Sequence, residues 1–301
     1  MVPNKSSAIN WAQCAILAIP LVVLPYALVT RTVHGRSAFA SAISGGCSMK
    51  QIQDAQVSAP GHAAAQSRIT KSATLVEKDG PYERWATDAR VFWYPRPFSD
   101  EDAYILAEDE IDFYRSSRIG NGAVVIDVGA NVGTFTRRAL NRGAKVVAVE
   151  INPALQNCLR RTFAKEIQDG RVIVYGKGAW HEDAMLDLRG DTVVLEKRVP
   201  AVRLPVTTID KIAVELNLAR VDFIKMDIEG AEKNALTGAR EVISRHLPSI
   251  SIATEHMDDD QTAIPALLRT LSVGRYEVKS NYCLFVSDYI ARPQVIHFDK
   301  N

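Results

Sequence analysis

Two apolar strands that each end in an acidic, glycine-marked turn most constrain what this chain can fold into. Residues 221–232 read Val-Asp-Phe-Ile-Lys-Met-Asp-Ile-Glu-Gly-Ala-Glu, and Asp127 to Gly133 form a similar turn earlier in the chain. In open α/β sheets, functional groups collect where strands end and helices begin. The two junctions therefore predict one shared cleft of a small-molecule enzyme. Because both tips are acidic, a bound phosphate is disfavoured.

Strand and helix patterns alternate from Ala123 onward, which predicts a parallel sheet with crossover helices. Alternating apolar residues around Gly190-Asp191 are typical of a hairpin, here over 184–206 and inserted at the edge of the sheet. Two strands near 275–279 and 282–287 would close the sheet as an antiparallel hairpin. The other expected strands are 123–127, 145–150, 171–175, 221–226 and 249–254, and the expected helices are 134–140, one that begins at Asn152-Pro153, 231–246 and 262–272.

The N-terminal part of the chain differs in composition from the rest. Residues 11–30 form an apolar run almost long enough to cross a bilayer core, which predicts an uncleaved single-pass membrane anchor after a tail of residues 1–10. A cleaved signal peptide is the alternative, because Ala40-Ser41-Ala42 offers a small-residue cleavage site. Residues 31–72 are rich in Ala, Ser, Gly and Gln without a sustained period, which predicts a flexible stalk.

Residues 73–120 are predicted to form an aromatic-rich N-terminal cap of the catalytic domain. Trp85, Phe92, Trp93, Tyr94 and Phe98 fall within this segment. Their rings either pack on the main sheet or form a lid that stacks on a substrate.

Charge and cysteine usage exclude several classes of protein. A formal net charge of +1 gives no reason to expect nucleic acid as a partner. Cys14, Cys47, Cys158 and Cys283 are far apart, which disfavours a zinc ribbon or a disulfide scaffold. Each of the four is predicted to be a small buried residue.

The turn after the first strand is predicted to hold a ligand. Glycine lets the backbone of Gly129 to Gly133 approach a ligand closely. Asn131 and Thr134 stand where a dinucleotide fingerprint has its second and third glycines, which weakens an NAD interpretation. Glu150, at the tip of the second strand, can accept hydrogen bonds from both hydroxyls of a ribose. The alternative is a carboxylate that is merely stabilised by a helix N-terminus.

Electrostatics favours S-adenosylmethionine as the bound molecule. This methyl donor carries a ribose and a sulfonium cation but no phosphate, and a cleft walled by Asp127, Glu150 and Asp227 attracts a cation. Trp180, with Ala179, could stack beneath the adenine, although a core tryptophan is an equally good interpretation. The predicted cofactor-binding residues are Asp127, Gly129, Asn131, Gly133, Thr134, Glu150, Ala179, Trp180 and Asp227.

At this point the sequence resembles the FkbM family of S-adenosylmethionine-dependent methyltransferases, over about residues 114–286. The resemblance rests on residues 124–133, 206–210, 221–232 and the Thr-Glu-His of 254–256. It implies an α/β, class I methyltransferase (Rossmann-like) fold over 121–301, with a seven-stranded, mostly parallel sheet and helices on both faces. It also implies methyl transfer to a hydroxyl of a sugar, glycan, lipid-linked or natural-product acceptor. A non-catalytic domain of the same fold that binds S-adenosylmethionine or a partner protein is the alternative.

Methyl transfer to a neutral hydroxyl needs an in-line acceptor oxygen and a base. His256 is the first candidate for the base, because the reference pKa of histidine lies near neutral pH. A histidine satisfied by a backbone carbonyl is the alternative, and Asp227 and Glu229 are the other catalytic candidates. Lys225 points to the same side of its strand as Asp227, where it either neutralises a carboxylate or reaches solvent. No metal is predicted, since the adjacent acids of 258–260 cannot all face one ion.

The compartment of the catalytic domain follows only in part from these features. Charges on both sides of the apolar run nearly cancel and leave its orientation open. The cytosolic side of a membrane is the simpler expectation, because the donor is made there. The sequence leaves the acceptor and the oligomeric state open.

Overall fold

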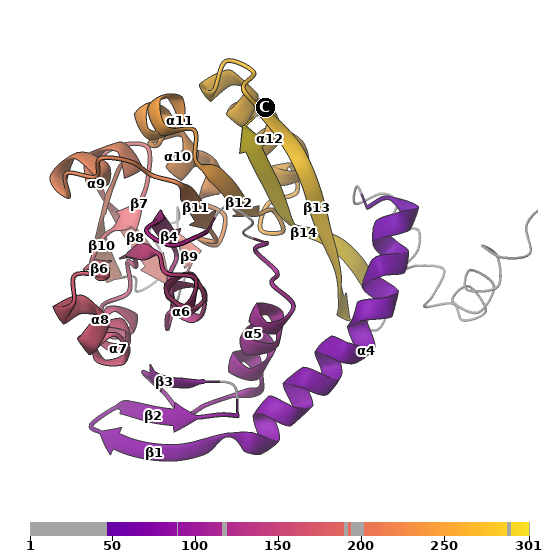
Figure 1. Cartoon of the computed structure of the whole chain (residues 1–301), viewed down its shortest axis with the longest axis vertical. Helices are drawn as coiled ribbons and strands as arrows, with labels where there is room; N and C mark the ends of the chain where they lie inside the picture. The colour runs from indigo at the N-terminus through magenta and orange to yellow at the C-terminus, as the bar shows by residue number, and fades with distance from the viewer. Residues whose placement is uncertain are drawn as a thin grey trace, which may run out of the picture.

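The computed structural model describes residues 47–88, 90–115, 119–189, 192–193, 202–287 and 290–300. These ranges form a large α/β sheet domain, a small sheet beside it, and an N-terminal part made of one long helix, a three-stranded sheet and a shorter helix (Figure 1).

The large sheet has seven strands in the order β13-β14-β12-β11-β4-β5-β6. Only β14 runs antiparallel to its neighbours in this sheet, and the other adjacent pairs are parallel. The predicted seven-stranded, mostly parallel sheet is therefore confirmed. Its strands are β4 (Val124–Val128), β5 (Lys145–Val149), β6 (Val172–Tyr175), β11 (Phe223–Met226), β12 (Ser249–Ala253), β13 (Tyr276–Ser287) and β14 (Ile290–Lys300).

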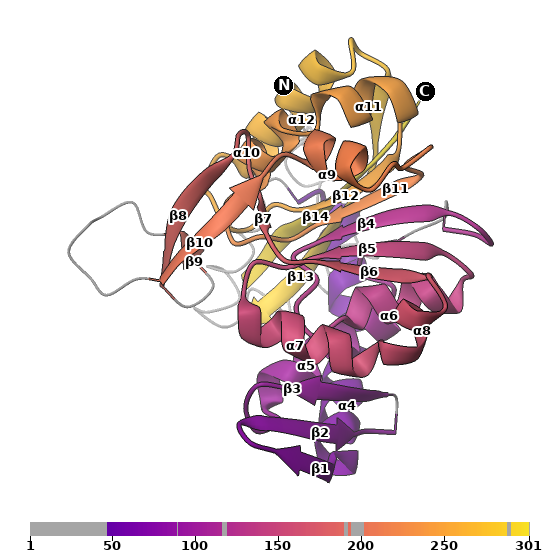
Figure 2. The same ribbon diagram turned by 90° about the vertical axis from the view of Figure 1, so that its left-hand side faces the viewer.

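Helices cover both faces of this sheet, as predicted (Figure 2). Successive residues of a strand point to opposite faces, so Ile126 and Val128 join one core and Val125 joins the other. Asn152 caps the start of α7 through its side chain, with Pro153 at the first helical position, as the sequence predicted. On one face lie α6 (Thr134–Asn141), α7 (Pro153–Thr162) and α8 (Ala164–Gln168), and on the other α9 (Ile209–Glu215), α10 (Glu232–Thr237), α11 (Arg240–His246) and α12 (Asp260–Leu271).

The helix predicted over 231–246 is wrong in one respect, because it is two helices, α10 and α11. The break falls at Gly238, whose carbonyl accepts a hydrogen bond from the backbone N–H of Asp210. The carboxylate of Asp210 then accepts hydrogen bonds from the N–H groups of Glu241 and Val242 and so caps the second helix. A contact from a distant residue therefore divides a helix that the local pattern presents as continuous.

The predicted C-terminal hairpin of 275–279 and 282–287 is also wrong. Both segments belong to the single strand β13, which pairs with β14. The register shifts between Val278 and Ser280 and again between Tyr282 and Cys283. The interval between the two predicted strands is an irregularity within one long strand.

The inserted segment forms its own sheet, with the order β7-β10-β8-β9 (Figure 2). Strands β8 (Ala184–Arg189) and β9 (Thr192–Val193) pair antiparallel, with Arg189 opposite Thr192, which confirms the hairpin. Its turn residues 190–191 lie outside the described ranges. The other strands of this sheet are β7 (Gly178–Ala179) and β10 (Val202–Thr207).

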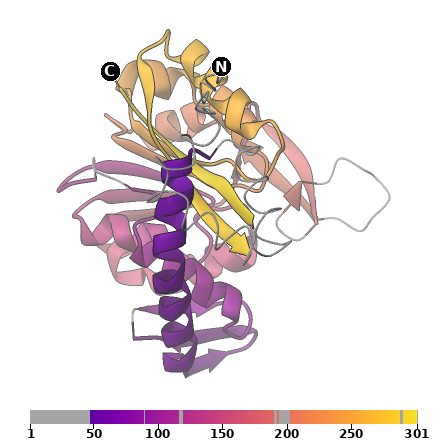
Figure 3. The same ribbon diagram turned by 90° about the vertical axis from the view of Figure 1, so that its right-hand side faces the viewer.

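The flexible stalk predicted for 31–72 is wrong for Met49–Ser72, which form the long helix α4 (Figure 3). Ser48 and Gln51 form a capping box at its start. Ala55, His62 and Ile69 are buried and lie on one face at a spacing of seven. Alanine and histidine at two of these positions give a weak apolar period, so the sequence pattern did not reveal the helix.

Cys47 and Cys283 are buried, as predicted, but they also form a disulfide, which their wide spacing did not predict. The bond joins the residue before the cap of α4 to β13, across 236 residues of chain. It exists because α4 folds back along β13, which no spacing in the sequence indicates (Figure 3). Cys158 is free and buried, as predicted.

The predicted tail of 1–10, the predicted anchor of 11–30 and the first part of the predicted stalk lie outside the described ranges. Among the helices that the structure does describe, none combines the length and the apolar character needed to span a bilayer.

The cap consists of the sheet of β1 (Thr74–Asp79), β2 (Tyr82–Ala86) and β3 (Val91–Tyr94), together with α5 (Asp100–Glu110). Phe92 and Tyr94 are buried in the same core as Phe163 of the large domain. The rings of β3 thus pack as core residues, which is the first of the two interpretations of the aromatic segment.

Candidate active site

One cavity lies at the carboxyl ends of β4, β5 and β11, with residues of α5 on its other side. This is the place that the two acidic turns predicted for the cleft. The predicted cofactor-binding residues that line it are Gly129, Asn131, Thr134, Glu150, Ala179 and Trp180. The catalytic candidates Asp227 and Glu229 line it as well.

The two glycines of the first turn are required by packing within the protein. Gly129 and Gly133 have φ of +76° and +98°, in the left-handed region that other residues avoid. A Cβ on Gly129 would overlap the backbone carbonyl oxygen of Asp227, and one on Gly133 would overlap the ring of Phe163. These contacts within the protein explain why both positions need glycine, and the predicted close approach of a ligand stays a prediction. Gly133 does not line the cavity.

Glu150 closes the turn and faces the cavity at the same time. One carboxylate oxygen accepts a hydrogen bond from the backbone N–H of Asn131 at 2.9 Å, and the other accepts one from the N–H of Asn152 at 2.8 Å. The two backbone donors fix the orientation of this carboxylate at the edge of the cavity. Its predicted contact with the hydroxyls of a ribose stays a prediction.

A buried lysine connects the two acidic strand tips. Lys225 Nζ donates a hydrogen bond to the carbonyl of Gly129 at 2.8 Å and lies 3.7 Å from carboxylate oxygens of both Asp127 and Asp227. It therefore neutralises carboxylates, which is the first of its two interpretations. Asp127 accepts a hydrogen bond from Thr136 at 2.6 Å and is fully buried behind the cavity, so it does not line the cleft as predicted.

Tyr114 is a site residue that the sequence reasoning missed. Its hydroxyl donates to Asp227 at 2.7 Å, and burial raises the pKa of this phenol well above its ordinary value. Burial acts to raise the pKa of Asp227 too, but Lys225, His256 and Tyr114 outweigh it and lower that pKa. Asp227 is consequently an ionised acceptor at neutral pH.

His256 lies among three carboxylates. Its Nδ1 is 2.9 Å from Glu232, and its Nε2 is 3.6 Å from Asp227 and 3.5 Å from Glu229. Burial acts to lower the pKa of His256, but the hydrogen bond to Glu232 and the three negative charges raise it to about 9. An imidazole with this pKa is protonated at neutral pH and has no free lone pair. The predicted role as resting-state base is therefore disfavoured, and His256 does not line the cavity.

Asp227, Glu229 and His256 are also spaced as metal ligands could be, with ligand atoms within 4.8 Å of one another. A metal would need the neutral imidazole. Because the pKa of His256 is raised to about 9, binding of a metal at neutral pH would have to displace this proton.

Helix α5 of the cap contributes three cavity residues, namely Ile105, Glu108 and Asp109. The sequence rule places functional groups at the ends of strands, so it could not predict that a helix packs over them and contributes to the cavity. Trp180 lines the cavity and is half-buried, with its ring tilted against His181, so it is not a core tryptophan.

The donor set of the cavity fits a cationic, ribose-containing molecule. Five carboxylate residues line it against two cationic side chains, Arg138 and Lys225. Arg138 is bound to Asp109 at 2.6 Å, and Lys225 to Gly129. The lining therefore carries excess negative charge, which suits a sulfonium and an ammonium group and repels a pyrophosphate.

The strand order, the glycine turn and this acidic cavity together define a class I methyltransferase. A family model described as "Methyltransferase FkbM domain" matches residues 127–278, which is half of the chain. The chain belongs to the FkbM methyltransferase family, and its methyl donor is S-adenosylmethionine.

Individual relatives are more distant. A Methanospirillum hungatei protein named "Probable ribosomal RNA small subunit methyltransferase A" is 42% identical over 50 residues, 17% of this chain and 20% of that protein. The crystal structure of methyltransferase FkbM from Methylobacillus flagellatus has 18% identity and a TM-score of 0.47, over 82% of this chain and 60% of that one. A chain from Streptococcus mutans in complex with SAH has 12% identity and a TM-score of 0.42, over 64% of this chain and 97% of that one. The chain thus spans about a fifth of the curated relative that it matches, and these likenesses do not define an acceptor.

Proposed function

We propose that this methyltransferase transfers the methyl group to a hydroxyl oxygen of a sugar, glycan, lipid-linked or natural-product acceptor. The observation that carries the proposal is the group of ionisable side chains at one end of the cavity, Glu108, Asp227 and Glu229. An oxygen nucleophile must lose a proton as it attacks, and such groups provide places for that proton. Apolar side chains of the cap and the inserted sheet, including Phe113 and Leu186, border the same space.

Each part of the site has a role in this reaction. Glu150, Asn131 and the first turn would hold the nucleoside, and Trp180 would stack on its base. Bound S-adenosylmethionine supplies an electrophilic methyl carbon. Asp227, fixed by Tyr114 and Lys225, would balance the positive charge in that region. The protein's remaining task is to place an oxygen in line and to remove its proton.

A nucleic acid acceptor is a poor match to the cavity. A phosphate backbone is bound mainly by lysine and arginine. Both cations that line this cavity already bind acidic groups or a carbonyl, and the surplus charge there is negative. The expectation of an acceptor other than nucleic acid is therefore retained as part of the proposal.

The test is labelling with the full-length protein, because α4 and its disulfide belong to the folded structure. The protein is incubated with methyl-labelled S-adenosylmethionine and, in separate reactions, with glycan, lipid, membrane and RNA fractions. We expect label in a glycan or lipid fraction, in a linkage that survives mild base as a methyl ether does. Label in RNA, or a base-labile methyl ester, would contradict the proposal.

A matched variant separates this proposal from a non-catalytic domain of the same fold. Asp227→Asn keeps the shape of the side chain and removes its charge, and we expect strongly reduced labelling. Glu182→Gln, on an exposed side chain beyond β7, is the control and should label as the wild type does. Donor binding by calorimetry without label in any fraction would favour the non-catalytic alternative.

A further inference from the structure

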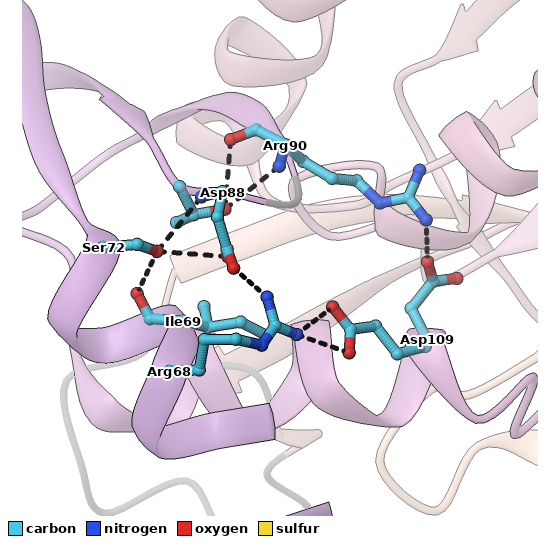
Figure 4. Close-up of polar contacts among 8 residues, drawn as sticks. Arg68, Ile69, Ser72, Asp88, Arg90 and Asp109 are labelled. Atoms are coloured by element: carbon cyan, nitrogen blue, oxygen red, sulfur yellow. Dashed lines mark hydrogen bonds and ion pairs between the residues drawn. The ribbon is translucent and has the colours of Figure 1, made fainter. Parts of the chain in front are cut away.

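Three consecutive carboxylates end helix α5, and two of them are bound by arginines. Asp109 binds Arg90 (Figure 4) and also accepts a hydrogen bond of 2.6 Å from Arg138. Glu110 accepts two hydrogen bonds of 2.7 Å from Arg68 of α4. Because Arg68 and Arg138 belong to α4 and α6, these pairs fix α5 between the long helix and the large domain.

Glu108, the third carboxylate, faces the cavity. Across the described ranges, no lysine or arginine forms an ion pair with it, while Tyr104 of the same helix hydrogen-bonds to it. Charged groups from two neighbouring strand ends act on it, namely Lys225 and Asp227 of the β11 segment and Glu255 after β12. Burial and the negative charges of Asp227 and Glu255 raise the pKa of Glu108 to about 8.

Two of the other candidates for the base, His256 and Asp227, are less suited to accept a proton at neutral pH. His256 already carries one, because its pKa is raised to about 9. Asp227 accepts the hydroxyl hydrogen of Tyr114 and has a lowered pKa, so it is a weak base. A general base is most effective when its pKa lies near the working pH.

We propose that Glu108 is the general base that takes the proton of the acceptor hydroxyl, an inference that rests on the proposed function. In the step, the acceptor O–H bond breaks and its proton passes to the Glu108 carboxylate. The oxygen forms a bond to the methyl carbon, and the carbon–sulfur bond breaks with its electron pair left on sulfur, which becomes a neutral thioether. Glu108 then releases the proton to solvent.

Donor binding would prepare this base. A positive charge near a carboxyl group stabilises its ionised form and lowers its pKa. Before binding, a large fraction of Glu108 is protonated at pH 7.5, since its pKa is about 8. Binding of the sulfonium should make a fraction of the protein molecules release this proton. S-adenosylhomocysteine has an uncharged sulfur, so a smaller fraction should release it.

This coupling gives a readout that does not require the acceptor. Calorimetric titration of the full-length protein with S-adenosylmethionine at pH 7.5, in two buffers of different ionisation enthalpy, measures the protons released. We expect a net release for the wild type that exceeds the release with S-adenosylhomocysteine, and no such difference for Glu108→Gln. Glutamine resembles the protonated side chain, so the variant should fold. The control is Glu101→Gln, on an exposed residue of the same helix, which should retain the difference.

Turnover is measured next, with the acceptor fraction that the wild-type protein labels. Glu108→Gln should transfer label at least about a hundredfold more slowly while its dissociation constant for the donor stays within about threefold. Turnover within threefold of the wild type, unchanged proton release, or donor binding weakened more than tenfold would each overturn the role as base. If no fraction takes up label from the wild type, the proposed function fails, and the proton release still decides whether Glu108 ionises on donor binding.

Discussion

The large sheet domain and the cap border the same cavity, but their residues reach it by different routes. In the sheet domain, Gly129, Glu150 and Asp227 stand at strand ends, where the sheet topology puts them. In the cap, Glu108 reaches the cavity because three arginines fix its helix in place. The family model covers most of the first region, including these three residues, and does not include the second. The comparison suggests a division of work, in which the sheet domain binds the donor and the cap adapts the site to an acceptor.

The largest effect is expected where the sheet domain is packed most tightly. Gly129→Ala should destabilise the protein by about 4 kcal/mol or more, because the new Cβ would overlap the backbone of Asp227 at a positive φ. Thermal unfolding measures the loss. Gly122 has the same φ of +76° with open space around it, so Gly122→Ala should cost only about 1 kcal/mol. Equal costs for the two variants would show that conformation alone, and not packing, requires the glycine.

The second prediction concerns the disulfide that joins α4 of the N-terminal part to β13 of the large sheet. Cys47→Ser should lower the free energy of unfolding by about 3 kcal/mol, because a link across a long loop restricts the unfolded chain. Chemical denaturation measures it, and reductant should have the same effect on the wild type and none on the variant. We expect donor affinity to change little, since the bond joins α4 to β13 away from the cavity. A large loss of donor affinity would mean that α4 supports the sheet domain as well.

Donor binding itself depends on a residue of the sheet domain. Glu150→Ala should weaken S-adenosylmethionine binding by about 2 kcal/mol, roughly thirtyfold, through loss of hydrogen bonds to the ribose. Calorimetry measures this, and Glu150→Gln, which keeps one carbonyl oxygen, should restore part of it. If alanine leaves the affinity unchanged, Glu150 only caps the turn formed by Asn131 and Asn152.

Much of the sheet domain follows from its sequence, because local rules and tertiary structure agree there. Asn152 and Pro153 start a helix whatever the rest of the chain does, and Glu150 precedes them at a strand end. Gly129 was located correctly, although packing against Asp227 could not be foreseen without the partner strand.

The cap could not be derived in the same way. The buried face of α4 is built from residues such as Ala55 and His62, which carry little apolar signal. Helix α5 contains many acidic residues, and nothing in its sequence sets Glu108 apart. Asp109 and Glu110 bind arginines, whereas Glu108 lines the cavity. The position of Glu108 at the cavity depends on contacts between segments far apart in the chain. No periodicity or motif spacing in the sequence reveals such contacts.

His256 lies beside Asp227 in the sheet domain, and its titration gives the smallest effect. The pKa of His256 is about 9 in the folded protein and about 6.5 in the unfolded chain. The imidazolium therefore stabilises the folded protein. This stabilisation is complete below about pH 6.5 and is lost as the pH rises through about 9. Between pH 7 and pH 9 we expect a loss of roughly 1 to 2 kcal/mol in the free energy of unfolding, and His256→Gln should remove this part of the pH dependence. The Cε1 proton resonance of His256 should titrate with a midpoint near 9. A midpoint near 6.5 would mean that His256 is able to take the proton from the acceptor hydroxyl. The proton transfer would then belong to the sheet domain and not to the cap.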